Sequence, residues 1–175
     1  MDKLKKYIPR VILLDTALLA ALYAASELIL RCFGLMFRQR VFWIVAALTA
    51  LGLIAGTVQL LLRIKKKAVR ITLIVLFAAL ALIACNSAFL LAAFAYEQEY
   101  VVEKDGVKYT AYVYSFMDTT VRYYDYKGPL VTGKQIRIKE YYRTAVVYDP
   151  FGSSYYANVE TTYYDDGGNV VKVTD

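Results

Sequence analysis

The sequence predicts a membrane protein in two parts: three transmembrane helices, then a small antiparallel all-β domain of about six strands, a meander or a partly closed barrel. Of its 175 residues, 59% are hydrophobic, against roughly half in soluble domains. Residues 1–95 carry twelve basic and three acidic side chains, a net +9, whereas residues 96–175 carry nine and twelve, a net −3. Fifteen of the 17 tyrosines also lie in the second part. We therefore expect a helical region over 1–96 and a β domain over 97–175.

Three apolar stretches, at about 11–30, 41–62 and 71–96, predict the helices. Each reaches the ~20 residues that a helix needs to cross a ~30 Å hydrocarbon layer. The first stretch contains Asp15 and Glu27, and an acid at the centre of a membrane helix costs about 2.5–3.5 kcal/mol. The surrounding Leu, Ile and Val residues outweigh that cost, so we keep all three spans.

The distribution of Lys and Arg predicts the orientation, because cytoplasmic loops carry more of them. Three crossings place the N-terminal tail and the second loop on one side, with nine cations against three in the first loop. The N-terminus is therefore expected in the cytoplasm and residues 97–175 outside it. These cations are Lys3, Lys5, Lys6, Arg10, Arg63, Lys65, Lys66, Lys67 and Arg70 on the inner side, and Arg31, Arg38 and Arg40 on the outer side.

Two processing signals are alternatives to this topology. Residues 1–30 have a basic start and an apolar run, as signal peptides do, but no clear cleavage site follows. Residues 82–85 read Leu-Ile-Ala-Cys, which is similar to the lipobox of bacterial lipoproteins, although Ala88–Ala95 is still apolar. We expect an uncleaved first span and a transmembrane thiol at Cys85.

Small residues recur at helical spacing in the spans, which lets membrane helices approach closely. Thr49, Gly52 and Gly56 form one such face in the second span, and alanine stripes occur in the other two. The spans also contain polar residues that are candidates for interhelical hydrogen bonds. Asp15 is in addition a candidate proton or ion site. These intramembrane polar residues are Asp15, Gln59 and Asn86.

From Glu99 onward the pattern alternates with period two and is rich in Tyr, Val and Thr, which favours strands. The Asp105-Gly106 pair predicts a tight hairpin, and an Asp165–Asn169 turn predicts a last one. Further turns are expected at 117–119, 128–133 and 149–152. The expected strands are 99–103, 107–116, 120–126, 135–142, 158–164 and 170–173, with Ile136 and Ile138 facing the core.

Tyrosine is abundant in these strands for one of two reasons. A tyrosine ring buries a large apolar area while its hydroxyl remains in contact with water, so tyrosines can complete a small core. Exposed tyrosine clusters are also typical of recognition surfaces. The candidate binding surface consists of Tyr112, Tyr114, Tyr124, Tyr126, Tyr141, Tyr155 and Tyr163.

The sequence offers little catalytic chemistry. It has no histidine, and its two cysteines, Cys32 and Cys85, both lie in the membrane part. We therefore predict no catalytic, cofactor or metal site, and we interpret Asp165–Asn169 as a turn rather than a calcium loop. The basic loop at 63–70 is explained by topology and anionic lipid, so no nucleic acid partner is expected.

Four segments carry a resemblance: Glu103–Tyr109, Tyr124–Tyr126, Glu140–Tyr142 and Asp149–Phe151. Over about 50 residues the chain resembles the tails of uncharacterised small membrane proteins of Gram-positive bacteria. The resemblance implies a multi-pass protein of the bacterial cytoplasmic membrane with a tyrosine-rich tail in the cell envelope. It implies no activity and no site residues.

Three functions are then open. The first is a membrane-anchored binding protein whose tyrosine-rich surface engages a partner protein, a peptide or an envelope polymer. The second is an accessory or immunity-type subunit whose helices associate with a transporter, a peptide toxin or a second copy. The third is an envelope enzyme that uses acidic residues, which we expect least because no catalytic motif is present.

Overall fold

The computed structural model describes residues 2–115, 117–142 and 160–174. It contains three long helices, α1 (Asp2–Cys32), α2 (Gln39–Leu61) and α3 (Lys67–Ala95). Each contains a segment long and apolar enough to cross a membrane. The three helices of the sequence prediction are confirmed, and they identify the chain as a membrane protein.

The chain divides into two compact units that do not follow the order of the sequence. One, here called the helical unit, consists of residues 1–28 and 40–93, and the other, the sheet unit, consists of residues 29–39 and 94–175. The sequence analysis assigned residues 29–39 to the membrane region. The structure groups this connection between α1 and α2 with the sheet.

Within the helical unit, two glycines of α2 make a close contact with α1. A Cβ atom built on Gly52 would lie 2.1 Å from the Thr16 Oγ1 atom. At Gly56, which is buried, a Cβ atom would lie 2.6 Å from the Leu13 Cδ2 atom. Only a residue without a side chain fits at either position, so the spacing of the glycines sets how closely α1 and α2 approach.

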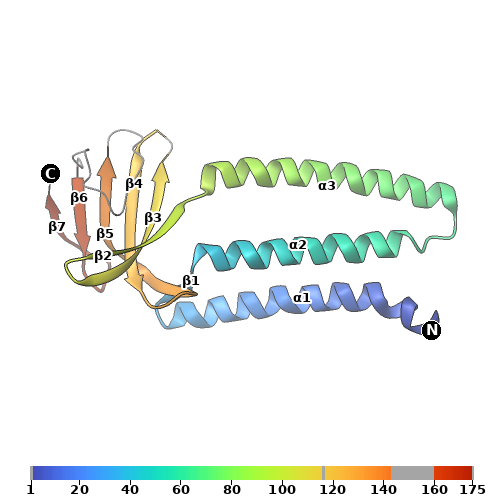
Figure 1. The fold of residues 1–175 in the computed structure, drawn as a ribbon, viewed down its shortest axis with the longest axis horizontal. Coiled ribbons are helices and arrows are strands. Elements are labelled where there is room, and N and C mark those ends of the chain that lie inside the picture. The colour runs from blue at the N-terminus through green and yellow to red at the C-terminus, as the bar shows by residue number, and fades with distance from the viewer. Residues whose placement is uncertain (1, 116, 143–159, 175) are drawn as a thin grey trace. The chain divides into compact units, whose positions relative to one another are not determined.

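The sheet unit holds an antiparallel meander in which each strand from β2 to β7 pairs with the next (Figure 1). The sheet is open, so of the two predicted architectures the meander is correct and the barrel is not. At the first hairpin Asp105 and Gly106 have φ angles of 53° and 76°, as a tight two-residue turn requires. The strands are β2 (Gln98–Lys104), β3 (Val107–Ser115), β4 (Thr119–Tyr126), β5 (Val131–Tyr142), β6 (Glu160–Tyr164) and β7 (Val170–Thr174).

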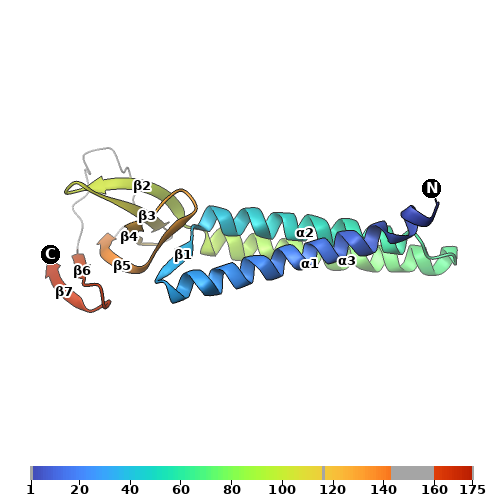
Figure 2. The ribbon, with the colours of Figure 1, turned by 90° about the horizontal axis from the view of Figure 1, so that it is seen from below.

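A seventh strand, β1 (Leu35–Phe37), comes from the short connection between α1 and α2 (Figure 2). Gly34 ends α1 with a φ of +69°, a conformation that glycine adopts readily at helix ends. The chain then pairs with the start of β5, where Leu35 lies opposite Gly133 and Phe37 opposite Val131. The sequence analysis predicted a loop over 128–133 and a fourth strand beginning at 135. The structure corrects this, because β1 supplies a partner that extends β5 back to Val131.

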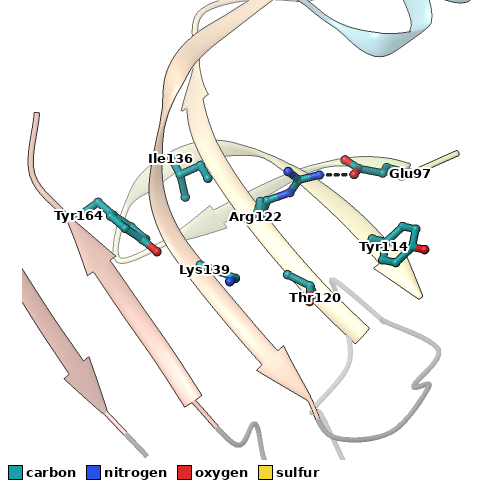
Figure 3. A pocket seen from close by; sticks show the side chains of 7 residues that line it. All are labelled: Glu97, Tyr114, Thr120, Arg122, Ile136, Lys139 and Tyr164. Carbon is teal, nitrogen blue, oxygen red and sulfur yellow. Dashed lines mark hydrogen bonds and ion pairs between the residues drawn. The ribbon is translucent and has the colours of Figure 1, made fainter. Parts of the chain in front are cut away.

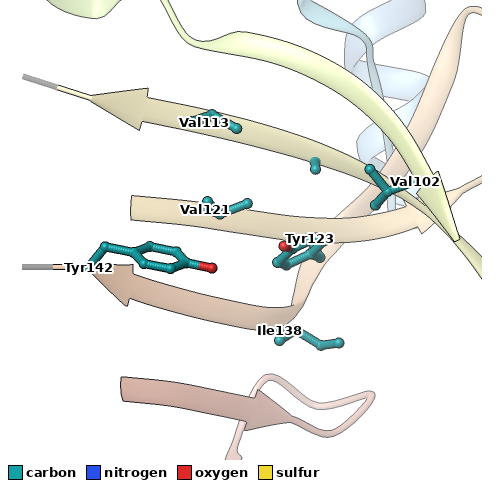
Figure 4. Packing of buried hydrophobic residues seen from close by; sticks show 7 residues of the cluster. Val102, Val113, Val121, Tyr123, Ile138 and Tyr142 are labelled. Atoms are coloured by element: carbon teal, nitrogen blue, oxygen red, sulfur yellow. The ribbon is translucent and has the colours of Figure 1, made fainter. Parts of the chain in front are cut away.

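The hydrophobic core lies on one face of the sheet, here called the core face (Figure 4). Register explains its composition, since residues directly opposite one another in paired strands share a face. Ala111, Tyr123 and Ile138 follow one another across β3, β4 and β5 in this way. The buried cluster consists of Val102, Ala111, Val113, Val121, Tyr123, Ile138 and Tyr142.

A buried carboxylate is part of this core face. Glu140 accepts hydrogen bonds from the hydroxyls of Tyr123 at 2.5 Å and Tyr142 at 3.2 Å, and it pairs with the Lys104 ammonium. The Lys104 Nζ atom also lies 4.2 Å from the centroid of the Tyr123 ring. A buried charge is tolerated only when it is paired and hydrogen-bonded. The four side chains meet that condition among themselves, so we assign this cluster to the stability of the core.

The expectation that Ile136 and Ile138 share the core face is wrong. Tyr123 lies opposite Ile138, but the next residue, Tyr124, lies opposite Ile136, so Arg137 is an extra residue on β5. Such a β-bulge shifts the alternation of side chains. Ile138 therefore lies in the core, while Ile136 faces the other side of the sheet.

Candidate functional site

The face of the sheet opposite the core carries an open groove, here called the tyrosine groove, with a volume of about 470 Å³. Figure 3 shows Tyr164 at one end, Tyr114 and Glu97 at the other, and Arg122 and Lys139 between them. Its lining residues are Glu97, Tyr114, Thr120, Arg122, Ile136, Lys139 and Tyr164.

Strand register brings these residues together. Tyr114 on β3 lies directly opposite Thr120 on β4, and Arg122 on β4 lies directly opposite Lys139 on β5. Ile136 and Lys139 are three residues apart, which in a regular strand would put them on opposite faces. The bulge at Arg137 removes that difference, so both side chains line the groove.

The centre of the groove is cationic. Arg122 and Lys139 are directly opposite across two neighbouring strands, an arrangement of like charges that destabilises a sheet. The Arg122 guanidinium donates to the carboxylate of Glu97, the only acidic side chain among the described residues of the lining. Lys139 is exposed and forms no ion pair with another side chain in the part of the chain that the structure describes.

A second hollow of about 370 Å³ adjoins the first and shares Ile136 and Tyr164 with it. Lys134 and Gln135 of β5 and the glycines of the β6–β7 turn form the rest of its lining. The two hollows therefore lie next to each other on the sheet and share part of their lining, with Lys139 in the first and Lys134 in the second.

A buried ion pair lies on the same face, in the same cross-strand row as the centre of the groove. Tyr112 is directly opposite both Glu99 and Arg122, so the row continues from the groove towards β2. The Arg38 side chain, which follows β1, donates from Nε to Glu99 Oε1 at 2.5 Å and from Nη1 to the Gly128 carbonyl at 3.4 Å. Only 7% of the Arg38 side chain and 3% of the Glu99 side chain are exposed. Arg38 thereby joins the α1–α2 connection to β2 and to the β4–β5 loop.

This environment changes the acidity of the adjacent tyrosine. Burial raises the pKa of Tyr112 to about 12, and the negative charge of Glu99 adds to the rise. An apolar, water-poor site disfavours the charged phenolate. Tyr112 is therefore a neutral, buried part of the sheet over the physiological pH range.

The predicted tyrosines have different surroundings. Tyr114 lines the groove, whereas Tyr112 and Tyr124 are buried and pack edge to face with ring centroids 5.5 Å apart. Tyr126 lies beneath the Arg38 guanidinium at 5.7 Å. The Tyr141 hydroxyl donates to Asp118 at 2.9 Å.

The last two predicted tyrosines lie elsewhere. Tyr163 is 38% exposed and lies opposite Ile138, so it belongs to the core face rather than to the groove. Tyr155 falls outside the described residues, as does the turn expected at 149–152. Tyr164, the neighbour of Tyr163, lines the groove instead.

The predicted residues of the helices also differ in their surroundings. Thr49 and Gln59 are half-buried, and Asp15 is exposed. Asn86 donates to the Leu82 carbonyl of its own helix at 2.9 Å. The Gly52 and Gly56 positions, by contrast, lie directly against α1.

The sequence analysis missed most of the groove, namely Glu97, Thr120, Arg122, Ile136, Lys139 and Tyr164. Alternation along a strand indicates which residues share a face, but it does not show where a bulge reverses the alternation. The sequence carries one usable signal, the Arg122 and Lys139 cations in neighbouring predicted strands, and it becomes visible only once the register of β4 and β5 is known.

In the acidic turn after β6, the hydrogen bonds of the Asp165 carboxylate come from the turn itself. The Asp165 carboxylate accepts the backbone amides of Gly167 and Asn169, both at 2.8 Å, and these bonds with the Asn169 side chain hold its pKa below the usual range. Among the described residues, no three acidic or cysteine side chains gather closely enough to hold a metal ion.

Comparisons of the chain with protein-family models, with curated proteins and with solved structures gave no match.

Proposed function

We propose that this membrane protein is a binding protein, whose sheet unit lies outside the cytoplasm and uses the tyrosine groove to engage a component of the cell envelope. The helices anchor the sheet in the bacterial cytoplasmic membrane, and the lipid bilayer covers their apolar surfaces. The ligand is a partner protein, a peptide or an envelope polymer, and no cofactor is required.

The tyrosine groove is the single observation that carries this proposal. Binding sites are concave, combine aromatic surface with a few polar groups, and are open to their ligand. Tyr114 and Tyr164 supply ring surface and hydroxyls, while Arg122 and Lys139 supply charged donors between them. Tyrosine and arginine are the residues most enriched in the energetic centres of interfaces.

The charge distribution and strand β1 support the location. Nine cations flank the inner side of the three spans and three flank the outer side. This is expected when the loop at 63–70 is cytoplasmic and the loop at 31–40 is external. The pairing of β1 with β5 requires the α1–α2 connection and the sheet to share one side of the membrane. Three crossings satisfy both requirements.

The two other functions gain less support. Gly52 and Gly56 contact α1 of the same chain, so this glycine pair is already used and does not offer a surface to a partner. Glycoside hydrolysis by acidic residues needs two carboxyl groups facing the substrate. The described lining of the tyrosine groove has one, Glu97, and it is paired with Arg122.

The test compares two adjacent tyrosines that lie on opposite faces. The full chain in detergent is incubated with isolated bacterial envelope fragments, and bound protein is measured by sedimentation. Tyr164→Ala removes one wall of the groove and is expected to weaken binding about tenfold. Tyr163→Ala, the matched control, is expected to leave it unchanged. Equal retention of binding in both variants would refute the groove as the binding site.

A further inference from the structure

We propose that the tyrosine groove takes a polyanionic chain, an envelope polymer whose repeated negative groups pair with Arg122 and Lys139 while its uncharged parts lie against Tyr114, Tyr164 and Ile136. This inference rests on the proposed function and names the ligand class for the same site. It follows from charge, shape and chemistry together.

The charge argument begins with the cross-strand pair at the centre of the groove. Arg122 and Lys139 repel one another because they lie directly opposite. Glu97 compensates Arg122 only, and a guanidinium has five N–H donors, of which one carboxylate occupies at most two. An anion bound between the two side chains would relieve the repulsion and use the free donors. A neutral ligand would leave the repulsion in place.

The shape argument distinguishes a chain from a single small anion. The second hollow adjoins the groove at Ile136 and Tyr164, and it has its own cation, Lys134. Together the two hollows contain three cations and one carboxylate, spread along β4 and β5 rather than gathered at one point. A ligand with regularly repeated charges can meet all three cations.

The two acids of the β6–β7 turn, which adjoins these hollows, are engaged elsewhere. Asp165 accepts the amides of its own turn, and Asp166 pairs with Arg137. Arg137 also makes two bonds to Asp125, at 2.8 and 3.0 Å. The positive charge of Lys134 and Lys139 is therefore not cancelled by these carboxylates.

The walls supply the second component of recognition. Aromatic rings stack on sugar rings and on the apolar backbone of polyols, and their hydroxyls provide hydrogen bonds to the same ligand. Tyr114 and Tyr164 lie at opposite ends of the groove, with Ile136 and the cations between them (Figure 3). The arrangement suits a chain in which charged groups alternate with uncharged units.

The test uses the full chain in nanodiscs of phosphatidylcholine and measures affinity for poly(glycerol phosphate), with neutral dextran as the matched polymer. We expect binding to the polyanion alone. Arg122→Ala and Lys139→Ala should each weaken it about tenfold, and the slope of log affinity against log salt should fall by about 1 for each cation removed. Lys172→Ala, a cation next to Tyr163, is the control that should change neither. Melting curves confirm that each variant is folded.

Three outcomes would overturn the inference. The first is equal binding of dextran and poly(glycerol phosphate), and the second is unchanged affinity in the folded Arg122→Ala and Lys139→Ala variants. The third is binding that disappears when the nanodiscs also contain phosphatidylglycerol, because the groove would then take the headgroups of its own bilayer. If envelope fragments still bind through Tyr164 in any of these cases, the proposed function stands and only the ligand class is wrong.

Discussion

The two faces of the sheet use the same residue types for different purposes. On the core face, Tyr123 and Tyr142 turn their hydroxyls towards Glu140, and Lys104 completes the cluster. On the opposite face, Arg122 and Lys139 lie in an open groove between two tyrosines, and among the described residues only Arg122 has a carboxylate partner. The Glu140 cluster pairs its charges, whereas the described lining of the groove carries two cations and one carboxylate.

This difference separates stability from binding within one small sheet. A buried carboxylate with three donors stabilises the fold only as a complete set, because each unpaired member would carry its desolvation cost. An exposed cation with no partner contributes almost nothing to stability. Its removal should change binding without unfolding the sheet. The predictions below test this division, starting with the residue whose loss should destabilise the sheet most.

Arg38→Met should have the largest effect on stability, even though Arg38 comes from the connection between two helices. The substitution leaves the Glu99 carboxylate buried without its cation, which typically costs about 3–5 kcal/mol. Unfolding of the full chain in detergent, followed by the near-ultraviolet circular dichroism of tyrosine, measures the change. Arg40→Met, at an exposed position two residues later, serves as the control and should be close to neutral.

A result in which Arg38→Met and Arg40→Met unfold at the same denaturant concentration would contradict the role of Arg38. The same reasoning predicts that a fragment beginning at residue 97 is less stable than the sheet in the full chain. Such a fragment lacks both β1 and Arg38. For this reason the binding tests above use the full chain.

Glu140→Gln should have the next largest effect and should act through the core face. The amide keeps an acceptor for one tyrosine hydroxyl but loses the charge that pairs with Lys104, so we expect a loss of about 1–3 kcal/mol. Glu103→Gln, at an exposed position on β2, is the control. Affinity for envelope fragments, measured on the folded fraction, should stay the same in both variants. A loss of affinity in Glu140→Gln alone would contradict the claim that the core face does not take part in binding.

Tyr112 should give the smallest effect, visible only at alkaline pH. Its pKa is about 12 in the folded chain and about 10 in an unfolded chain, so the folded state holds the proton more tightly. Its contribution is complete below pH ~10 and is lost as the pH rises towards ~12, at up to about 1.4 kcal/mol per pH unit. Tyr112→Phe should therefore lose less stability than the wild type between pH ~10 and ~12. An identical pH dependence would argue against a buried phenol.

Much of the fold could be predicted from the sequence because local patterns specify it. The three helices follow from runs of apolar residues long enough to cross a membrane, and the first hairpin follows from Asp105-Gly106. In β3, Ala111 and Val113 are two residues apart and therefore share a face, and both lie in the core. Each of these features depends on residues close together in the chain.

The rest depends on partners distant in sequence. Strand β1 has only three residues, and its pairing partner at 131–133 is almost a hundred residues away. Tyr112 and Tyr124 are predicted to lie on an exposed surface, but the structure buries both. On the same face, Arg38 of the α1–α2 connection binds Glu99 of β2. Ile136 lines the groove together with Lys139 because Arg137 is an extra residue in the β4–β5 ladder. No local pattern signals these three features.

The central claim is that the sheet projects from the outer side of the membrane, and thiol labelling in intact bacterial cells tests it most directly. Cys32 and Cys85 are first replaced by alanine, and a single cysteine is introduced by Lys108→Cys on β3 or by Lys66→Cys between α2 and α3; both positions are exposed. A membrane-impermeant maleimide should label the first variant in intact cells and the second only after lysis. Labelling of the Lys66→Cys variant but not of Lys108→Cys in intact cells would contradict the account.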